Sequence, residues 1–162
     1  MAQRLNHAKL SAPLFNKYLE FSLAFKDSSL DLKQRDLINI RVSQLNGCAF
    51  CLDMHIKEAK IHGEGELRLH HVSIWRESQL FTPRERAAFE WAETLTRLPE
   101  HGVSDDIYNR VREHFSEQEI SDLTFAVTAI NGWNRLSIAF TLVPGSMDVA
   151  YGLSKVVFSD AA

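Results

Sequence analysis

The sequence lacks several features that would identify its class at once. It has only two cysteines in 162 residues, which excludes a disulfide-rich secreted scaffold. No apolar run approaches the roughly 20 residues that a membrane helix requires, and the first ten residues lack the apolar stretch of a signal peptide. A formal net charge of −3 leaves no basic surface for nucleic acid and no polybasic segment for a membrane. We therefore expect a cytoplasmic protein that binds neither nucleic acid nor membrane.

The composition and the residue patterns predict an all-α protein. A chain that is 45% hydrophobic and 24% charged can bury a core, and its length fits one domain, residues 1–162. No segment shows the two-residue alternation of a half-buried strand, whereas apolar residues recur at helical spacing throughout. We expect six to eight helices and no strands.

Helix starts are well marked in the second half. Thr82 precedes Pro83 and stands three residues before Glu85, which is the pattern of a capping box with proline at the first helical position. Ser116 has a glutamate at the same spacing, and Ser104 precedes two aspartates that favour the positive end of a helix dipole. These patterns predict three helices that begin at residues 83, 105 and 117.

In the first half, the pattern predicts three more helices, at 11–26, 32–46 and about 51–61. The first has an expected apolar face of Leu14, Tyr18, Phe21 and Phe25. The second starts after a cap at Ser29 or Asp31 and has little polar face, so we expect it to be buried. An Asn–Gly pair at residues 46–47 should end or kink it.

A second Asn–Gly pair at residues 131–132 suggests an internal pseudo-repeat. Residues 36–51 and 121–136 align on the two pairs with an offset of 85 residues. Trp133 then stands where Cys48 stands, and Leu136 stands where Cys51 stands. If the two segments are related, only the first half carries the chemistry of the cysteines.

Cys48 and Cys51 are three residues apart, and His55 follows four residues after the second. Two cysteines placed at random in this length fall three apart on the order of once in a hundred times. On a helix all three side chains share one stripe, so the sulfurs can form a disulfide and His55 can accept a proton from Cys51. A helix start also stabilises a thiolate, which by itself favours Cys48, the more exposed of the two by this interpretation, as the attacking thiol.

Other interpretations of the cysteines stay open. Free cysteines are often buried small hydrophobic residues, and Cys48, Cys51 and His55 could supply three ligands of a metal-binding module. No second CxxC or histidine pair completes a ligand set. Histidines 7, 62, 101 and 114 stand among polar residues, and we interpret them as solvated surface residues.

Residues 35–59, RDLINIRVSQLNGCAFCLDMHIKEA, resemble the core motif of the alkylhydroperoxidase D-like (AhpD-like) family of the carboxymuconolactone decarboxylase superfamily. Residues 131–145 resemble the end of the same domain, so the resemblance covers a core of about 15–145. It implies the all-helical AhpD-like fold and a homo-oligomer, either a trimer or a hexamer. It also implies peroxidase or disulfide-reductase activity, with a hydroperoxide substrate, a dithiol, thioredoxin-like or lipoyl reductant, and no cofactor.

The resemblance also assigns roles to residues. Cys51 would be the peroxidatic thiol and Cys48 the resolving thiol, while His55 and a carboxylate twelve residues before Cys48 would relay a proton. That carboxylate is Asp36 here, where the family usually has glutamate. Its side chain is shorter by about 1.5 Å, and catalytic geometry is sensitive to such shifts. Asp36 could equally be an ordinary first-turn helix acid, and a decarboxylase or lactone-processing enzyme is the alternative activity.

Overall fold

The computed structural model describes residues 2–156 and confirms the all-α prediction. Residue 1 and residues 157–162 of the predicted domain lie outside the described part. Within residues 2–156 there are nine α-helices and no strand, and seven of the helices have six residues or more. The α-helices are α1 His7–Leu10, α2 Ala12–Leu23, α3 Leu32–Asn46, α4 Ala49–Ile61, α5 Glu66–His71, α6 Pro83–Thr96, α7 Asp105–Arg112, α8 Glu117–Phe140 and α9 Asp148–Tyr151; three short 3₁₀ helices are η1 Ala24–Asp27, η2 Val72–Ile74 and η3 Leu153–Lys155.

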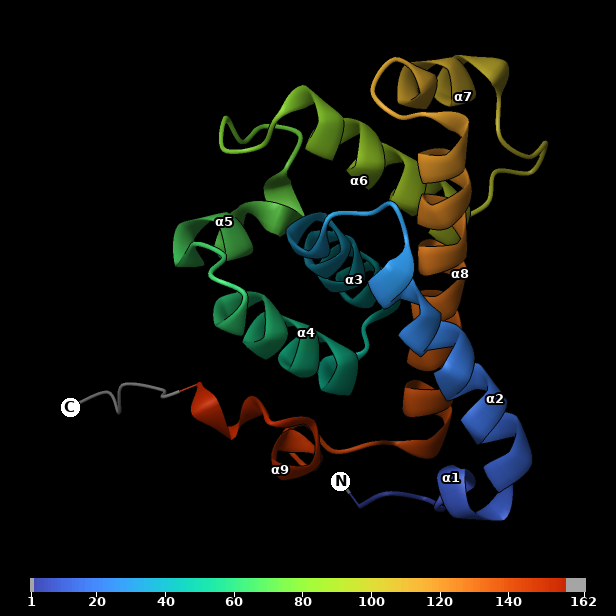
Figure 1. Ribbon diagram of the computed structural model, residues 1–162, viewed down its shortest axis with the longest axis vertical. Helices are drawn as coiled ribbons and strands as arrows, with labels where there is room; N and C mark the ends of the chain where they lie inside the picture. Colours follow the sequence, from blue (N-terminus) through green and yellow to red (C-terminus); the bar gives the residue numbers. More distant parts are fainter. Residues whose placement is uncertain (1, 157–162) are drawn as a thin grey trace.

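Helix α3 lies at the centre of the molecule, with α4, α6 and α8 packed around it (Figure 1). Its side chains Leu37, Ile38, Ile40 and Val42 are each at most 1% exposed. These four positions point in different directions around the helix, so α3 is covered on nearly all sides. The structure confirms the prediction of a buried second helix.

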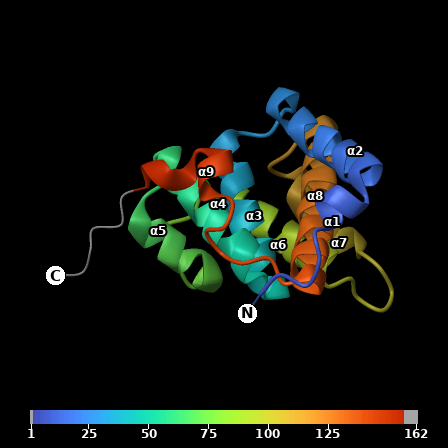
Figure 2. The same ribbon diagram turned by 90° about the horizontal axis from the view of Figure 1, so that it is seen from below.

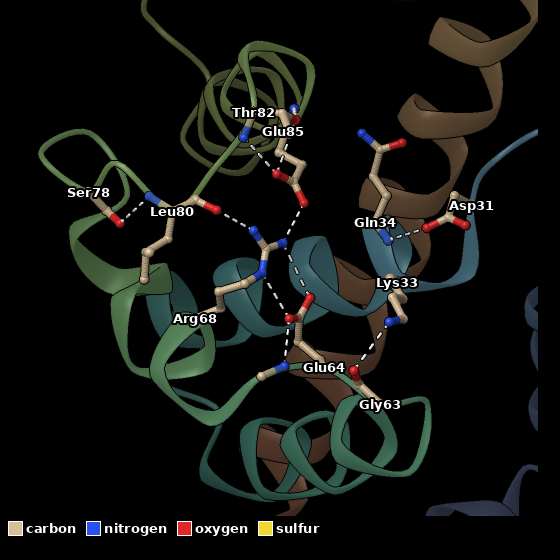
Figure 3. Close-up of polar contacts among 11 residues, drawn as sticks. Asp31, Lys33, Gln34, Gly63, Glu64, Arg68, Ser78, Leu80, Thr82 and Glu85 are labelled. Carbon is tan, nitrogen blue, oxygen red and sulfur yellow. Dashed lines mark hydrogen bonds and ion pairs between the residues drawn. The ribbon is translucent and has the colours of Figure 1, made fainter.

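The predicted helix caps are confirmed. Thr82 and Ser116 each form a complete capping box with the glutamate three residues later, and Ser104 accepts from the N–H of Ile107. Of the two candidate caps for α3, Asp31 is the one used, since its side chain accepts from the N–H of Gln34 at 3.1 Å (Figure 3).

Arg68 joins α5 to the start of α6. Its guanidinium bonds Glu64 at 2.8 Å, reaches Glu85 of the capping box and also donates to the carbonyl of Leu80 (Figure 3). Because guanidinium carries five donors in a planar fork, one arginine can hold three segments together. This contact fixes the loop between α5 and α6.

Helix α2 lies on the outside of α8 (Figures 1 and 2), and none of its residues is buried. It is attached through Tyr18, whose hydroxyl donates to the carbonyl of Ala129 at 2.7 Å, and through Ser22, which accepts from the indole N–H of Trp133. The predicted apolar face of this helix was wrong at Leu14, which is 76% exposed. Phe15 contributes to the packed face of α2 instead, and its ring lies edge-on against Trp133. The contact with Trp133 of α8, which the spacing within α2 does not reveal, determines which residues face inward.

The segment that contains α9 is fastened to the outer side of α4. The buried ammonium of Lys57 lies 2.7 Å from the carboxylates of both Asp53 and Asp148. Burial acts to lower the pKa of Lys57, but the two carboxylates outweigh it and the pKa is raised. Lys57 therefore stays charged and holds the end of the described chain against α4.

Candidate active site

The two cysteines stand at the start of α4, where the sequence breaks the preceding helix. Gly47 ends α3 with a left-handed backbone, φ +68°, and Cys48 is the N-cap of α4. The two thiols form a disulfide, with their Cα atoms 5.4 Å apart. The sulfur of Cys48 also accepts from the N–H of Cys51. The Asn–Gly break thus positions the CxxC pair at the positive end of a helix, as predicted.

Both cysteines are buried, which corrects one expectation. Cys48 is 2% exposed and Cys51 is 1% exposed, so Cys48 is not distinguished by exposure. A cavity of about 480 Å³ reaches Cys51, and Cys48 is absent from its described lining. Of the two cysteines, Cys51 in the first turn of α4 is therefore the one that lines the cavity.

The cavity has an apolar body and a charged end. Helices α2, α4 and α8 supply most of the apolar wall, which includes Phe15, Leu19, Phe50, Met54, Ile130 and Trp133. The charged end is lined by titratable and charged groups from α3, from α4 and from the C-cap of α4, namely Arg35, Asp36, His55, Glu58 and His62. A cavity of this size and composition is suited to a small organic molecule that brings one polar group to the cysteine.

His55 is paired with Glu58 at this charged end. Its Nδ1 lies 2.7 Å from Oε2 of Glu58, and its Nε2 is buried without a hydrogen-bond partner among the described residues. Burial acts to raise the pKa of Glu58, but the hydrogen bond to His55 and nearby positive charges outweigh it, so the pKa is lowered. Glu58 is therefore ionised near neutral pH.

Asp36 is paired with His62 and makes no hydrogen bond to His55. Its Oδ2 lies 2.6 Å from Nδ1 of His62. Asp36 is 3% exposed, and burial raises the pKa of its carboxyl, an effect that the hydrogen bond with His62 only partly offsets. Asp36 and His55 both line the cavity, and the charge of His55 acts to lower the pKa of Asp36. The relay predicted between them stays a prediction.

Two of the histidines that we interpreted as solvated surface residues line the cavity instead. His62 is held there by Asp36. His7 enters the lining from α1, where its ring stacks on Phe140 with the ring centroids 5.0 Å apart. Polar neighbours in the sequence did not reveal this, because a local window does not report which helix packs over a residue.

Sequence reasoning also missed Glu58, although a signal was present. Glu58 stands three residues after His55, which places the two side chains on the same face of a helix. The pairing of Asp36 with His62 spans 26 residues and two helices, and the sequence carried no comparable signal for it.

Residues 2–156 contain neither a metal-binding cluster nor a membrane-spanning helix. Across residues 2–156, no three histidine, cysteine, aspartate or glutamate side chains are disposed to hold a metal ion together. In the same residues, every helix is too short or too polar to cross a bilayer.

Comparison with known proteins identifies the class. The model of the carboxymuconolactone decarboxylase family matches residues 12–94. The chain belongs to this family, and within it the chain is an AhpD-like protein, as its likeness to an AhpD-type structure at 38% identity shows.

Two relatives cover nearly all of the fold. The uncharacterized protein YdfG of Bacillus subtilis is 41% identical over 139 residues, which are 86% of this chain and 95% of YdfG. The crystal structure of ATU0492 from Agrobacterium tumefaciens, a protein of unknown function considered an AhpD-type antioxidant defence protein, is 38% identical with a TM-score of 0.85. The superposition covers 88% of this chain and 98% of ATU0492.

A more distant structure shares the fold alone. The debrominase Bmp8 is 15% identical, with a TM-score of 0.77 over 90% of this chain and 78% of Bmp8. The AhpD-like fold therefore serves an enzyme, and the reaction of the present chain has to be argued from its own residues.

Proposed function

We propose that the protein is a thiol-dependent peroxidase that reduces hydroperoxides through Cys51 and Cys48. The observation that carries this proposal is a CxxC disulfide at a helix start whose second cysteine lines a cavity, one helical turn before His55. A helix start stabilises a thiolate, a histidine one turn away can remove the thiol proton, and a partner cysteine in disulfide distance can resolve the oxidised thiol.

The reaction starts from the reduced pair. His55 accepts the proton of Cys51, and the thiolate attacks the outer oxygen of the hydroperoxide. The O–O bond breaks, the leaving alkoxide takes the proton to become an alcohol, and Cys51 becomes a sulfenic acid. Cys48 then attacks the sulfur of Cys51, which releases water and forms the disulfide. An external dithiol reduces it through a mixed disulfide.

Three further features complete the proposal. The substrate is an organic hydroperoxide, because most of the cavity wall is apolar. The reductant is a dithiol, either a lipoyl group or a thioredoxin-like protein. The protein acts in the cytoplasm as a homo-oligomer, a trimer or a hexamer, and uses no cofactor.

A test compares hydroperoxide turnover with a dithiol reductant in the unchanged protein, Cys48→Ser and Cys51→Ser. We expect both substitutions to abolish catalytic turnover, and only Cys48→Ser to retain one equivalent of peroxide consumption, because it keeps the attacking thiol but cannot form the disulfide. Thiol titration before and after one equivalent of hydroperoxide should show the loss of two thiols in the unchanged protein. If both variants keep the turnover of the unchanged protein, the proposal is wrong.

The family name supports one alternative, a decarboxylase or lactone-processing enzyme. Such chemistry needs no disulfide, so an activity that survives Cys48→Ser would favour it. A CxxC/His metal-binding module would instead show stoichiometric zinc that Cys51→Ser removes.

A further inference from the structure

Two separate carboxylate–histidine pairs lie at the charged end of the cavity, Glu58 with His55 and Asp36 with His62. We infer that Glu58, rather than Asp36, is the positioning residue that sets the tautomer of His55 and stabilises its protonated form. This inference rests on the proposed thiol chemistry of Cys51 and assigns a role that the CxxC motif with its upstream carboxylate does not contain.

The first step of the argument concerns the proton on His55. An ionised carboxylate can only accept hydrogen bonds, and the hydrogen bond from His55 helps to keep Glu58 ionised despite its partial burial. The 2.7 Å contact therefore requires that Nδ1 of His55 carry a hydrogen and donate it. In the neutral ring, Nε2 then has the lone pair, and this is the atom that is buried without a partner. His55 is thus held in the form that can act as a base at Nε2.

The second step concerns Asp36. Its carboxylate oxygen is engaged with His62 at 2.6 Å, and its side chain is 3% exposed. Asp36 comes from α3, whereas Glu58 stands on the same helix as His55 and one turn beyond it. Because i and i+3 side chains are fixed neighbours on a helix, the orientation of His55 by Glu58 needs no adjustment between helices. The carboxylate in contact with His55 therefore belongs to α4.

The third step follows the proton. The S–H bond of Cys51 breaks, its electron pair stays on sulfur, and the proton binds Nε2 of His55. The resulting imidazolium is stabilised by the negative charge of Glu58 on its other nitrogen. After the O–O bond of the hydroperoxide breaks, the same proton passes to the alkoxide, and His55 returns to its neutral form.

The charges around Glu58 determine how this step depends on pH. Among residues 2–156, five titratable or charged side chains influence Glu58 or are influenced by it. They are His55 on α4, His62 at the C-cap of α4, Arg35 and Asp36 on α3, and Tyr151 on α9. The positive members of this group favour the ionised form of Glu58, whereas burial and the charge of Glu58 raise the pKa of Tyr151.

The experiment measures the rate at which iodoacetamide alkylates Cys51 as a function of pH. Reduced Cys48→Ser protein is the common background, so that one thiol titrates. In it we compare Glu58→Gln, Glu58→Asp, Asp36→Asn and, as a matched control on the surface, Glu77→Gln. If Glu58 acted only as a nearby negative charge, its removal would lower the pH midpoint of Cys51 alkylation. A rise in the midpoint therefore reports the loss of the imidazolium partner rather than the loss of charge.

We expect Glu58→Gln to raise the midpoint and to slow peroxide oxidation of Cys51 by about 10- to 100-fold. Glu58→Asp should fall between, because it keeps an ionised acceptor, and Glu77→Gln should match the background. Asp36→Asn should leave the midpoint in place or lower it. ¹⁵N NMR of the imidazole should show the Nδ1–H tautomer of His55 in the background protein and its loss in Glu58→Gln.

The outcomes separate this inference from the proposed function. If Asp36→Asn raises the midpoint and Glu58→Gln does not, the inference is overturned, although peroxide turnover by the unchanged protein would still support the proposed function. If the unchanged protein reduces no hydroperoxide and Glu58→Gln still raises the midpoint of alkylation, the role of Glu58 stands and the peroxidase proposal fails.

Discussion

The same dipeptide, Asn–Gly, has opposite effects in the two halves of the molecule. At residues 46–47 it ends α3: Gly47 adopts φ +68°, and Cys48 begins the next helix. At residues 131–132 it lies within α8, which continues for eight more residues to Phe140. The internal similarity in the sequence is therefore accompanied by a break in the chain only where the cysteines follow.

The surroundings of each glycine account for the difference. A Cβ on Gly47 would meet nothing within 4 Å, so the left-handed backbone of a helix end is what favours glycine there. A Cβ on Gly132 would lie 1.9 Å from the hydroxyl oxygen of Tyr18. One glycine permits a turn, and the other permits the close approach of a neighbouring helix.

The two asparagines meet in space. The side-chain amide of Asn46 donates to the oxygens of both Asn131 and Asn134, each at 2.9 Å, and the amide of Asn134 donates to Ser43. This buried network joins the end of α3 to the middle of α8. The two Asn–Gly pairs therefore serve three purposes. Gly47 ends α3, Gly132 allows Tyr18 of α2 to approach α8, and the asparagines join α3 to α8.

The largest effect on stability should come from removing Asn134, which connects α8 to α3. Asn134 is fully buried, and Asn134→Ala leaves Ser43 without the amide donor and removes one acceptor of Asn46. We expect the free energy of unfolding to fall by about 3 kcal/mol in urea titration. The exposed Asn109→Ala is the control and should change it by less than about 0.5 kcal/mol. A loss as small as that of the control would show that the network contributes no net stability.

A smaller effect should come from the glycine that ends α3. Gly47→Ala introduces backbone strain without a clash, so we expect a loss of about 1–2 kcal/mol. Gly47→Asn should lose less, because asparagine tolerates the left-handed region. Denaturant midpoints measure both, and equal losses for alanine and asparagine would contradict the backbone explanation.

The smallest effect should come from the glycine inside α8, and its sign should depend on Tyr18. In the unchanged protein, Gly132→Ala displaces the tyrosine and outweighs the gain in helix propensity, for a net loss below about 1 kcal/mol. In a Tyr18→Ala background the clash is gone, and the same substitution should stabilise by about 0.5–1 kcal/mol. A double-mutant cycle measures the change of sign. Destabilisation in both backgrounds would place the constraint on Gly132 elsewhere than Tyr18.

Much of the fold could be predicted from local patterns. The caps at Thr82, Ser104 and Ser116, the end of α3 at Gly47 and the burial of α3 all follow from residues that are close in sequence. Such features depend on backbone hydrogen bonds within one turn, and these leave a signature in a short window.

The site was predicted less completely, because its polar pairs join different parts of the chain. The positions of Cys48, Cys51 and His55 on one helix follow from their spacing, and Glu58 could have been found in the same way. The partner of Asp36 could not, since the identity of His62 as that partner depends on how α3 crosses α4.

Helix α2, which has no buried residue, has a consequence for how the interior is reached. Segments with few buried contacts open locally at a free-energy cost well below that of global unfolding, and amide hydrogen exchange detects them first. Because α2 supplies part of the apolar wall of the cavity and contacts Trp133, an opening of this helix would expose the ring of Trp133 while α3, α4 and α8 stay folded. Access to the cavity that Cys51 lines would then require only a local opening, at a lower free-energy cost than unfolding of the core.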